Sequence, residues 1–527
     1  MSGFEKDGYW FLPEKPDREV FGRLIFYPEK APKLLLSNTL EESKSIEQIA
    51  NGNSFEVLNG YFLDGKEVTL VYCYRRGGLK TGVQTAEIFA RYIIVGHHFK
   101  SKADIKFSEI SARYTYLEEW VLSSSFEISW QAQDEESKHE ITLKQSIESP
   151  KELGSLSGFT VSMHDLPWIP VEHLNLFRFL GEIPTKLSVE EKKSILFKSD
   201  AEKPFEDFID ALILFQDLLI FCTGEMINIY DVISFPFVRK KKIRIPKSIE
   251  IAMRLGAIEP ENTVVSKSGF AVKSYGERYK AVEEEVLEPE LIQIYFSTGA
   301  AQNEKQKLNR VKALLMFHEI KEKMPYVLTN WELNKQEVGS IFDLYLRLTY
   351  IPERHADDLF LTISQAIEAF HRVSHKQDKF DSDMFNSARE AMIKSIPKRP
   401  TKYGLNNNEE SAELITKLRE FIESKLQYIN EFSLKERLVE LYNEHQECLP
   451  DGLFELGEIE DFSKQVRDTR GSLTHLSKSS SQKRSKHIIP REERRELIRK
   501  LLVLLQACLI KKIGLDDAQV KAVLSRR

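Results

Sequence analysis

Residues 54–75, SFEVLNGYFLDGKEVTLVYCYR, carry the clearest local fold signal of this sequence. Two runs rich in β-branched and aromatic residues flank Asp64-Gly65, a combination typical of a β-hairpin with a tight turn. Similar strand-like runs recur through the first half of the chain, at 91–99, 126–131, 140–145, 227–237 and 291–296. Helical spacing interrupts them at 203–222 and 248–254. We therefore expect residues 1–300 to form a β-rich domain.

The second half of the chain has a different hydrophobic pattern. From about residue 300 onward, apolar residues recur every three or four positions, which indicates amphipathic helices. The predicted helices cover 305–323, 338–350, 356–374, 382–396, 411–430, 433–447, 458–477 and 491–513, with prolines between many of them. The sequence thus predicts an α+β protein, in which residues 301–527 form an all-α bundle after the β-rich domain.

The composition is that of a globular protein with more than one domain. The chain has 527 residues, 42 % hydrophobic and 30 % charged, with a net charge of −6. Its 4 cysteines have no metal-ligand spacing, so neither a disulfide framework nor a structural zinc site is expected. The N-terminus lacks the features of a secretory leader, and the longest apolar run, 209–222, is too short and polar for a membrane span. These features predict a cytoplasmic protein without membrane association.

Common catalytic and ligand-binding motifs are missing. The sequence has no G-x-x-x-x-G-K-[ST] loop, H-E-x-x-H, G-x-S-x-G or EF-hand loop. His97 and His98 end a strand-like run, so we expect them on opposite faces, one buried and one exposed. His371 and His375 have an i, i+4 spacing that can hold zinc, but the sequence indicates no third ligand nearby. We predict no metal site and no cofactor.

Residues 465–476, QVRDTRGSLTHL, combine an arginine and a histidine on one predicted helix. Helical geometry places Arg470 beside Val466, at the edge of an apolar stripe, where a guanidinium needs an anionic or hydrogen-bonding partner. His475 lies about 140° further around the helix. The two side chains point to different sectors around the helix axis. We therefore expect a cleft that uses both residue types to be formed by two chains, which favours a homodimer.

Arginine and histidine together suit metal-free cleavage of RNA. A histidine can take a proton from the ribose 2′-OH or give one to the leaving 5′-oxygen. An arginine can stabilise the charge that develops on the phosphate. Arg-x4-His also occurs by chance, and the alternative is an arginine in a salt bridge and a surface histidine. On spacing alone that alternative is favoured.

The surroundings of the motif are strongly basic. Residues 463–512 contain 14 Lys and Arg against 4 Asp and Glu, a net +10, which suits a polyanion such as RNA. Lys464, Arg467 and Lys478 are candidate RNA-binding residues, and a solvated helix face followed by a basic loop is the alternative. Asp468 can pair with Arg467 or Lys464.

Glu368 lies on the polar face of the helix predicted over 356–374. It can pair with Arg470 and hold it in a cleft, or only with its i+4 neighbour Arg372, and the sequence favours the second interpretation.

The motif and two further regions resemble a known family. An arginine, four residues and a histidine on a late helix are typical of a HEPN domain. GYWFLP at 8–13, followed by Pro16-Asp17 and Gly22-Arg23-Leu24, resembles the start of the ApeA N-terminal domain. The segments IIVGHHF at 93–99 and FLTISQAIEAFHR at 360–372 also resemble ApeA-type segments.

The resemblance implies an endoribonuclease of bacterial anti-phage abortive infection, with a C-terminal HEPN-type helical bundle. It implies that Arg470 and His475 are catalytic, that the substrate is RNA, possibly transfer RNA, and that the toxic activity follows a phage-derived trigger. By analogy with other toxin–sensor chains, the N-terminal domain is then a sensor or regulator.

One residue departs from the family pattern. The position after the motif arginine is often polar in the family, whereas here it is Gly471. The change removes an expected orienting hydrogen bond, and a glycine inside a helix costs about 1 kcal/mol relative to alanine. Gly471 therefore keeps open an alternative function, a non-catalytic HEPN module that binds RNA or a protein partner as a scaffold.

Overall fold

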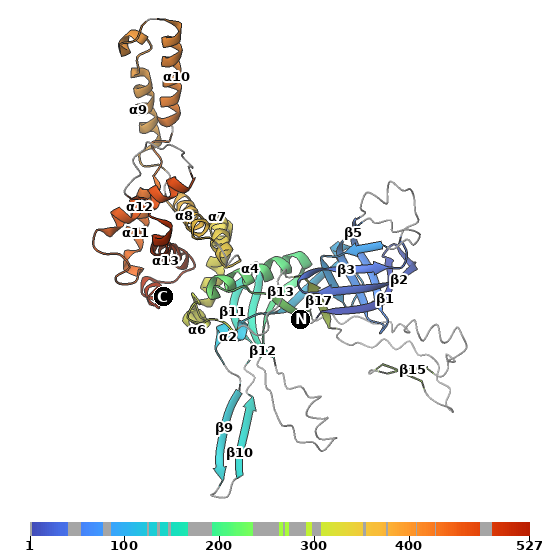
Figure 1. Ribbon diagram of the computed structural model, residues 1–527. Coiled ribbons are helices and arrows are strands. Elements are labelled where there is room, and N and C mark those ends of the chain that lie inside the picture. Colours follow the sequence, from blue (N-terminus) through green and yellow to red (C-terminus); the bar gives the residue numbers. More distant parts are fainter. Residues whose placement is uncertain are drawn as a thin grey trace. The chain divides into compact units, whose positions relative to one another are not determined.

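The computed structural model describes residues 3–40, 54–76, 86–123, 126–133, 138–145, 149–166, 192–234, 263–266, 269–272, 291–297, 307–350, 355–375, 378–406, 408–426, 428–474 and 487–526. The chain forms two compact units, Met1–Pro325 and Tyr326–Arg527 (Figure 1). The first is rich in strands and the second is helical, which confirms the predicted α+β class. The boundary predicted near residue 300 lies outside the described residues.

The first unit is dominated by antiparallel strands. They are β1 Phe4–Leu12, β2 Lys15–Tyr27, β3 Lys30–Leu36, β4 Ser54–Phe62, β5 Glu67–Arg76, β6 Ala86–Phe89, β7 Tyr92–Val95, β8 Lys106–Tyr114, β9 Phe126–Gln133, β10 Lys138–Gln145, β11 Lys151–Leu156, β12 Phe159–Leu166, β13 Lys192–Pro204, β14 Ile229–Ser234, β15 Thr263–Ser266, β16 Gly269–Val272 and β17 Ile292–Phe296.

The largest sheet has the strand order β11-β12-β13-β8-β14-β17-β7-β5-β4-β1-β2-β3-β6. Because β6 pairs with both β3 and β5, the strands β1 to β6 close on themselves around an apolar core that includes Trp10, Leu24 and Leu58. The strands β4 and β5 pair antiparallel, so the hairpin predicted around Asp64-Gly65 is confirmed. The pairs β9–β10 and β15–β16 form separate two-stranded sheets.

The expected arrangement of His97 and His98 is wrong. The strand β7 ends at Val95, because Gly96 turns the backbone with φ 119°, a conformation that favours glycine. Beyond this turn, both imidazoles are partly buried. Their Nδ1 atoms lie 3.9 and 3.7 Å from the carboxylate of Glu67, so the two rings approach one acid.

Helix α4, Phe205–Thr223, is the long helix predicted in the first half of the chain (Figure 1). It packs on β8 and β13, where the Tyr114 hydroxyl of β8 donates to the Leu212 carbonyl, and its Phe208 ring contacts Phe159 of β12 in a tilted arrangement. A short helix, α2, spans Leu117–Val121. Among the described residues, no helix is long and apolar enough to cross a membrane.

A helix was expected over 305–323, but most of the described part of this segment is not helical. Residues 307–316 are not helical, and α6 begins only at Phe317 and ends at Ile320. The Leu315 amide donates to the Cys222 carbonyl, and the Leu315 carbonyl accepts from Nε1 of Trp120. These tertiary hydrogen bonds, together with burial of Leu314 and Leu315, replace the helical ones that the apolar spacing suggested.

The second unit is helical, and most predicted helices are confirmed within a few residues. The helices are α7 Met324–Tyr350, α8 Ala356–Ser374, α9 Ser382–Ser395, α10 Glu409–Leu426, α11 Leu434–His445, α12 Glu458–Thr474, α13 Arg494–Lys512 and α14 Asp517–Leu524, of which α14 was not predicted. The helix α7 begins well before the predicted start at 338, and its backbone is kinked at Val338. Short 3-10 turns occur at Lys102–Asp104, Lys321–Lys323, Pro400–Tyr403, Gln446–Cys448 and Arg491–Glu493.

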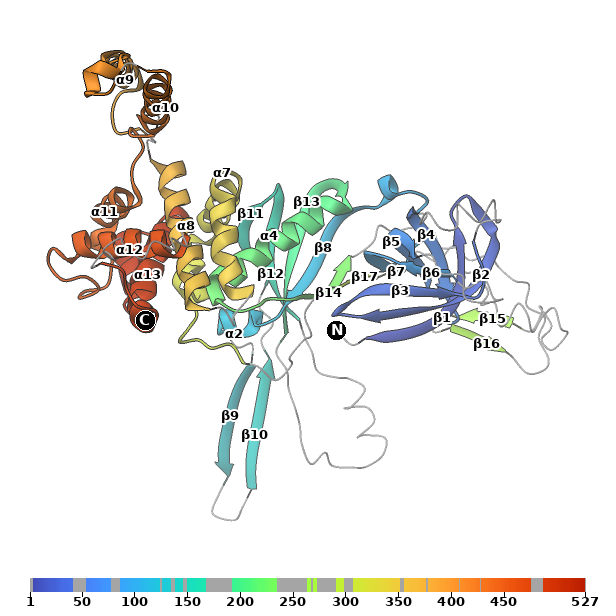
Figure 2. The same cartoon turned by 45° about the horizontal axis from the view of Figure 1, so that its top comes forward.

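Helices α8, α11, α12 and α13 pack against one another (Figure 2). Their buried faces contribute residues such as Ile367, Leu441, Val466 and Leu501. Helices α9 and α10 form a hairpin between α8 and α11 in sequence, whose neck is closed by hydrogen bonds of Asn430 with Phe380. The all-α bundle expected for this half of the protein is therefore present.

Candidate functional site

Helix α12 places Arg470 at the border between the core of the second unit and its surface. Phe462, Val466 and Thr469 of this helix are buried and face the bundle. Arg470 follows them, and its Nη1 lies 2.5 Å from Oε2 of Glu368 on α8. The expectation that a guanidinium at this border has an anionic partner is confirmed.

Glu368 binds two arginines at once. Besides Arg470, its Oε1 accepts from Nη2 of Arg372, one helical turn along α8, at 3.2 Å. Arg372 also lies 3.6 Å from the carboxylate of Glu431. The two pairings considered for Glu368 from the sequence therefore occur together, and the carboxylate links α8 to α12.

A third arginine, Arg437 on α11, lies behind this surface cluster. Its side chain is fully buried, its Nε donates to the Phe432 carbonyl at 2.9 Å, and its Nη1 donates to Nδ1 of His371 at 2.9 Å. Burial lowers the pKa of Arg437, and nearby Arg372 lowers it further, whereas Glu368 among the neighbouring acids acts in the opposite direction. Arg437 thus joins α11 to α8 through hydrogen bonds in the core.

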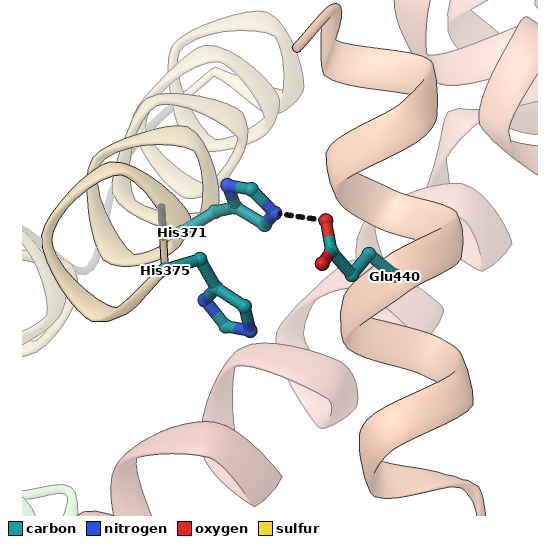
Figure 3. Close-up of side chains that lie close together, drawn as sticks. All are labelled: His371, His375 and Glu440. Carbon is teal, nitrogen blue, oxygen red and sulfur yellow. Dashed lines mark hydrogen bonds and ion pairs between the residues drawn. The ribbon is translucent and has the colours of Figure 1, made fainter. Parts of the chain in front are cut away.

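Next to Arg437, the imidazoles of His371 on α8 and of His375 just beyond its end approach carboxylates of α11, and Figure 3 shows the two rings with Glu440. Nε2 of His371 lies 2.8 Å from Glu440, and Nε2 of His375 lies 2.7 Å from Glu444. The two rings stack with centroids 4.4 Å apart and an angle of 6° between them. Burial is the main cause that lowers the pKa of His371, so this ring is neutral near pH 7.

This cluster contains the third potential metal ligand that the sequence did not reveal. The ligand atoms of His371, His375 and Glu440 lie within 4.8 Å of one another. The hydrogen bonds, however, assign their protons. Because a guanidinium only donates, Nδ1 of His371 must accept from Arg437, and the ring proton then sits on Nε2 and is donated to Glu440. Nε2 has no free lone pair in this state, so the geometry fits a hydrogen-bonded pair better than a metal site.

The candidate RNA-binding residues of α12 have local acidic partners. Nζ of Lys464 lies 2.9 Å from Asp461, and Nε of Arg467 lies 2.7 Å from Asp468. The second contact confirms one of the two pairings considered for Asp468. His475 and Lys478 lie outside the described residues, as does most of the predicted basic loop after α12.

The basic segment is less cationic in three dimensions than its net +10 suggests. Several of its basic residues bind acids that lie outside residues 463–512 and are therefore missing from that count. These pairs are Lys464–Asp461, Arg470–Glu368, Arg494–Asp357, Lys500–Glu458 and Lys511–Asp517. Any attraction for a polyanion therefore depends on the remaining basic residues and on displacement of these acidic partners by the polyanion.

Gly471 has open space around it in the part of the chain that the structure describes, where a Cβ built at this position meets no atom outside the local helix within 4 Å. Replacing Gly471 by alanine is expected to stabilise the second unit by up to about 1 kcal/mol, because alanine loses less backbone entropy in a helix. Thermal unfolding followed by circular dichroism measures the change.

Gly514 provides the matched control for this substitution. Its φ is 103°, and a Cβ there would collide with the ring of Tyr326. Gly514→Ala should therefore lower the melting temperature. A Gly471→Ala variant that also melts at lower temperature would show that the glycine is required by the fold.

Residues that sequence reasoning missed lie mainly on α11. The buried positions of this helix are Leu434, Arg437, Leu438, Leu441 and His445, so a charged residue interrupts an apolar stripe. A charge at such a position signals a buried polar partner, and that signal was available in the sequence. The identity of the partner, His371, required the tertiary structure.

The chain was compared with known protein families. Residues 5–236 match the family described as ApeA N-terminal domain 1, and residues 361–519 match the family described as Apea-like HEPN. The chain is an ApeA-like HEPN protein. Comparison with curated proteins and with solved structures gives no match.

The HEPN match includes most of the second unit. It runs from α8 into α14, so it contains Arg470, Glu368 and the cluster around Arg437. Membership associates this ApeA-like HEPN protein with nuclease or other RNA-related function and with anti-phage defence.

Proposed function

We propose that this protein is a metal-independent endoribonuclease of bacterial anti-phage abortive infection. Its substrate is RNA, possibly transfer RNA, and Arg470 and His475 are its catalytic residues. The observation that carries the proposal is the position of Arg470: within the HEPN match it is partly exposed, with its guanidinium held by Glu368 at the surface of the bundle.

The proposed chemistry uses the ribose as nucleophile. The 2′-oxygen attacks the adjacent phosphorus while the bond to the 5′-oxygen breaks, which leaves a 2′,3′-cyclic phosphate and a 5′-hydroxyl. His475 takes the 2′-OH proton or supplies the proton that the leaving 5′-oxygen requires. Arg470 stabilises the negative charge on the phosphate oxygens. DNA lacks the 2′-OH and is not cut.

Two chains complete the proposed site. In a homodimer, each chain contributes one Arg470 and one His475, so one histidine can act as base while the other acts as acid. Lys464, Arg467 and Lys478 contact neighbouring phosphates. The N-terminal domain restrains this activity until a phage-derived trigger is present.

The cleavage ends of cellular RNA test this function. RNA sequencing after phage infection, in cells with the wild-type protein, should reveal new 5′-hydroxyl ends at defined positions. The His475→Ala protein, expressed at the same level, should give none. Equal patterns of ends in the two strains would remove the nuclease proposal.

Cleavage by the purified protein is expected to persist in EDTA. Arginine supplies the charge and histidine the proton transfer, so the proposed scheme needs no ion. A magnesium-dependent ribonuclease in the same buffer serves as the control and should lose its activity. Loss of cleavage in chelator, followed by recovery with magnesium or manganese, would show that the acid–base scheme is wrong.

The second candidate is a non-catalytic HEPN module that binds RNA or a protein partner. Gly471 favours it, because the open space at this position would accept a polar side chain and none is present. Expression in bacteria separates the two functions. A nuclease loses its toxicity in the His475→Ala variant, whereas a binding module retains its effect.

A further inference from the structure

Two arginines from different helices meet at one carboxylate beside the candidate site. Oε1 of Glu368 accepts from Arg372, and Oε2 binds Arg470, so each oxygen has its own guanidinium. A phosphodiester presents a similar pattern, because its two non-bridging oxygens share one negative charge around a single atom. Guanidinium groups bind both kinds of anion through paired N–H donors.

The three side chains are accessible to a ligand. Half of the Arg372 side chain is exposed, as are 30 % of Arg470 and 19 % of Glu368. Arg372 is the most exposed of the three, so its pair with Glu368 contributes little to stability, and an incoming anion can reach both guanidinium groups from the solvent side. Arg372 retains Glu431 as a second partner and therefore stays beside the site when Glu368 is displaced.

We infer that Arg372 binds the RNA backbone together with Arg470, and that Glu368 occupies, in the RNA-free protein, the position that a phosphodiester takes when RNA binds. The inference rests on the proposed function, which identifies the ligand as RNA. Glu368 then has two effects. It orients both guanidinium groups in the absence of RNA, and it competes with the phosphate for them.

Binding of a fluorescein-labelled single-stranded RNA tests Arg372, with His475→Ala in every protein so that the RNA is not cut. Arg372→Ala should weaken binding about tenfold, because a charge-assisted hydrogen bond is lost. The slope of log K against log salt should also fall by about 0.7, the value for one phosphate contact on a single strand.

Arg23→Ala is the matched control. Arg23 belongs to the first unit, half of its side chain is exposed, and it also has two acidic partners, Asp7 and Glu5. Its removal makes the same change in net charge and should leave RNA affinity within about twofold. An equal loss of affinity in the Arg23 and Arg372 variants would overturn the inference.

Glu368→Gln tests the competition. Glutamine has the shape of glutamate without its charge, so RNA should bind about tenfold more tightly, provided the phosphate must displace this side chain. Weaker binding would contradict the inference and would leave Glu368 only a structural role. Melting temperatures of all variants identify any loss of folding, and Arg372→Lys, which retains the charge, should preserve the salt slope.

The outcomes separate this inference from the proposed function. If the protein with intact His475 cuts RNA while Arg372→Ala binds like Arg23→Ala, the nuclease function stands and the inference fails. If phage infection produces no cut RNA but Arg372→Ala and Glu368→Gln change affinity in opposite directions, the inference stands. The protein would then be a phosphate-binding module rather than a nuclease.

Discussion

Arg470→Ala and His475→Ala are each expected to reduce RNA cleavage by at least about a hundredfold. Removing the arginine leaves the developing phosphate charge without its guanidinium, and removing the histidine takes away the proposed proton-transfer group. Single-turnover kinetics with saturating protein and labelled RNA measure the chemical step directly.

Arg470→Lys separates charge from geometry in the same assay. Lysine retains the positive charge but cannot present two parallel N–H donors, so RNA binding should survive while turnover is lost. Thr474→Ala is the neighbouring control, because Thr474 is exposed and its hydroxyl donates to the Arg470 and Gly471 carbonyls of its own helix. Normal cutting by Arg470→Lys or Arg470→Ala would show that the active site is elsewhere.

Arg437→Met is expected to lower the free energy of unfolding by about 3 kcal/mol. Methionine fills part of the space but donates no hydrogen bond, so the buried Nδ1 of His371 and the partly buried Phe432 carbonyl lose their donor. Each such group costs about 1–3 kcal/mol. Urea unfolding followed by the helical circular-dichroism signal measures the loss.

Two further variants test the cause of this loss in stability. Arg372→Met removes an exposed arginine and should cost less than about 1 kcal/mol. The double variant Arg437→Met, His371→Leu removes both partners of the buried hydrogen bond and should recover part of the stability, because no unpaired ring nitrogen remains. A double variant that is less stable than the sum of the two single changes would contradict this account of the core.

Much of the fold could be predicted from local patterns. The β4–β5 hairpin follows from β-branched and aromatic residues around Asp64-Gly65, and α4 follows from its apolar spacing. These elements depend on neighbours in sequence, and periodicity reports such neighbours directly. The failure at His97 and His98 has a local cause, because Gly96 turns the backbone away from the strand. The failure at Leu315 has a tertiary cause, because backbone hydrogen bonds with Trp120 and Cys222 replace a helix.

The candidate site divides in the same way. The helical period alone shows that Arg470 lies at the edge of an apolar stripe and needs an anion, and the i, i+4 spacing alone indicates the Glu368–Arg372 pair. The tertiary structure is needed to show that Glu368 also holds Arg470, and that Arg437 lies buried against His371. The packing of α8 against α11 and α12 determines these partners. It brings together charges far apart in the chain, and their pairing depends on distances that no sequence spacing encodes.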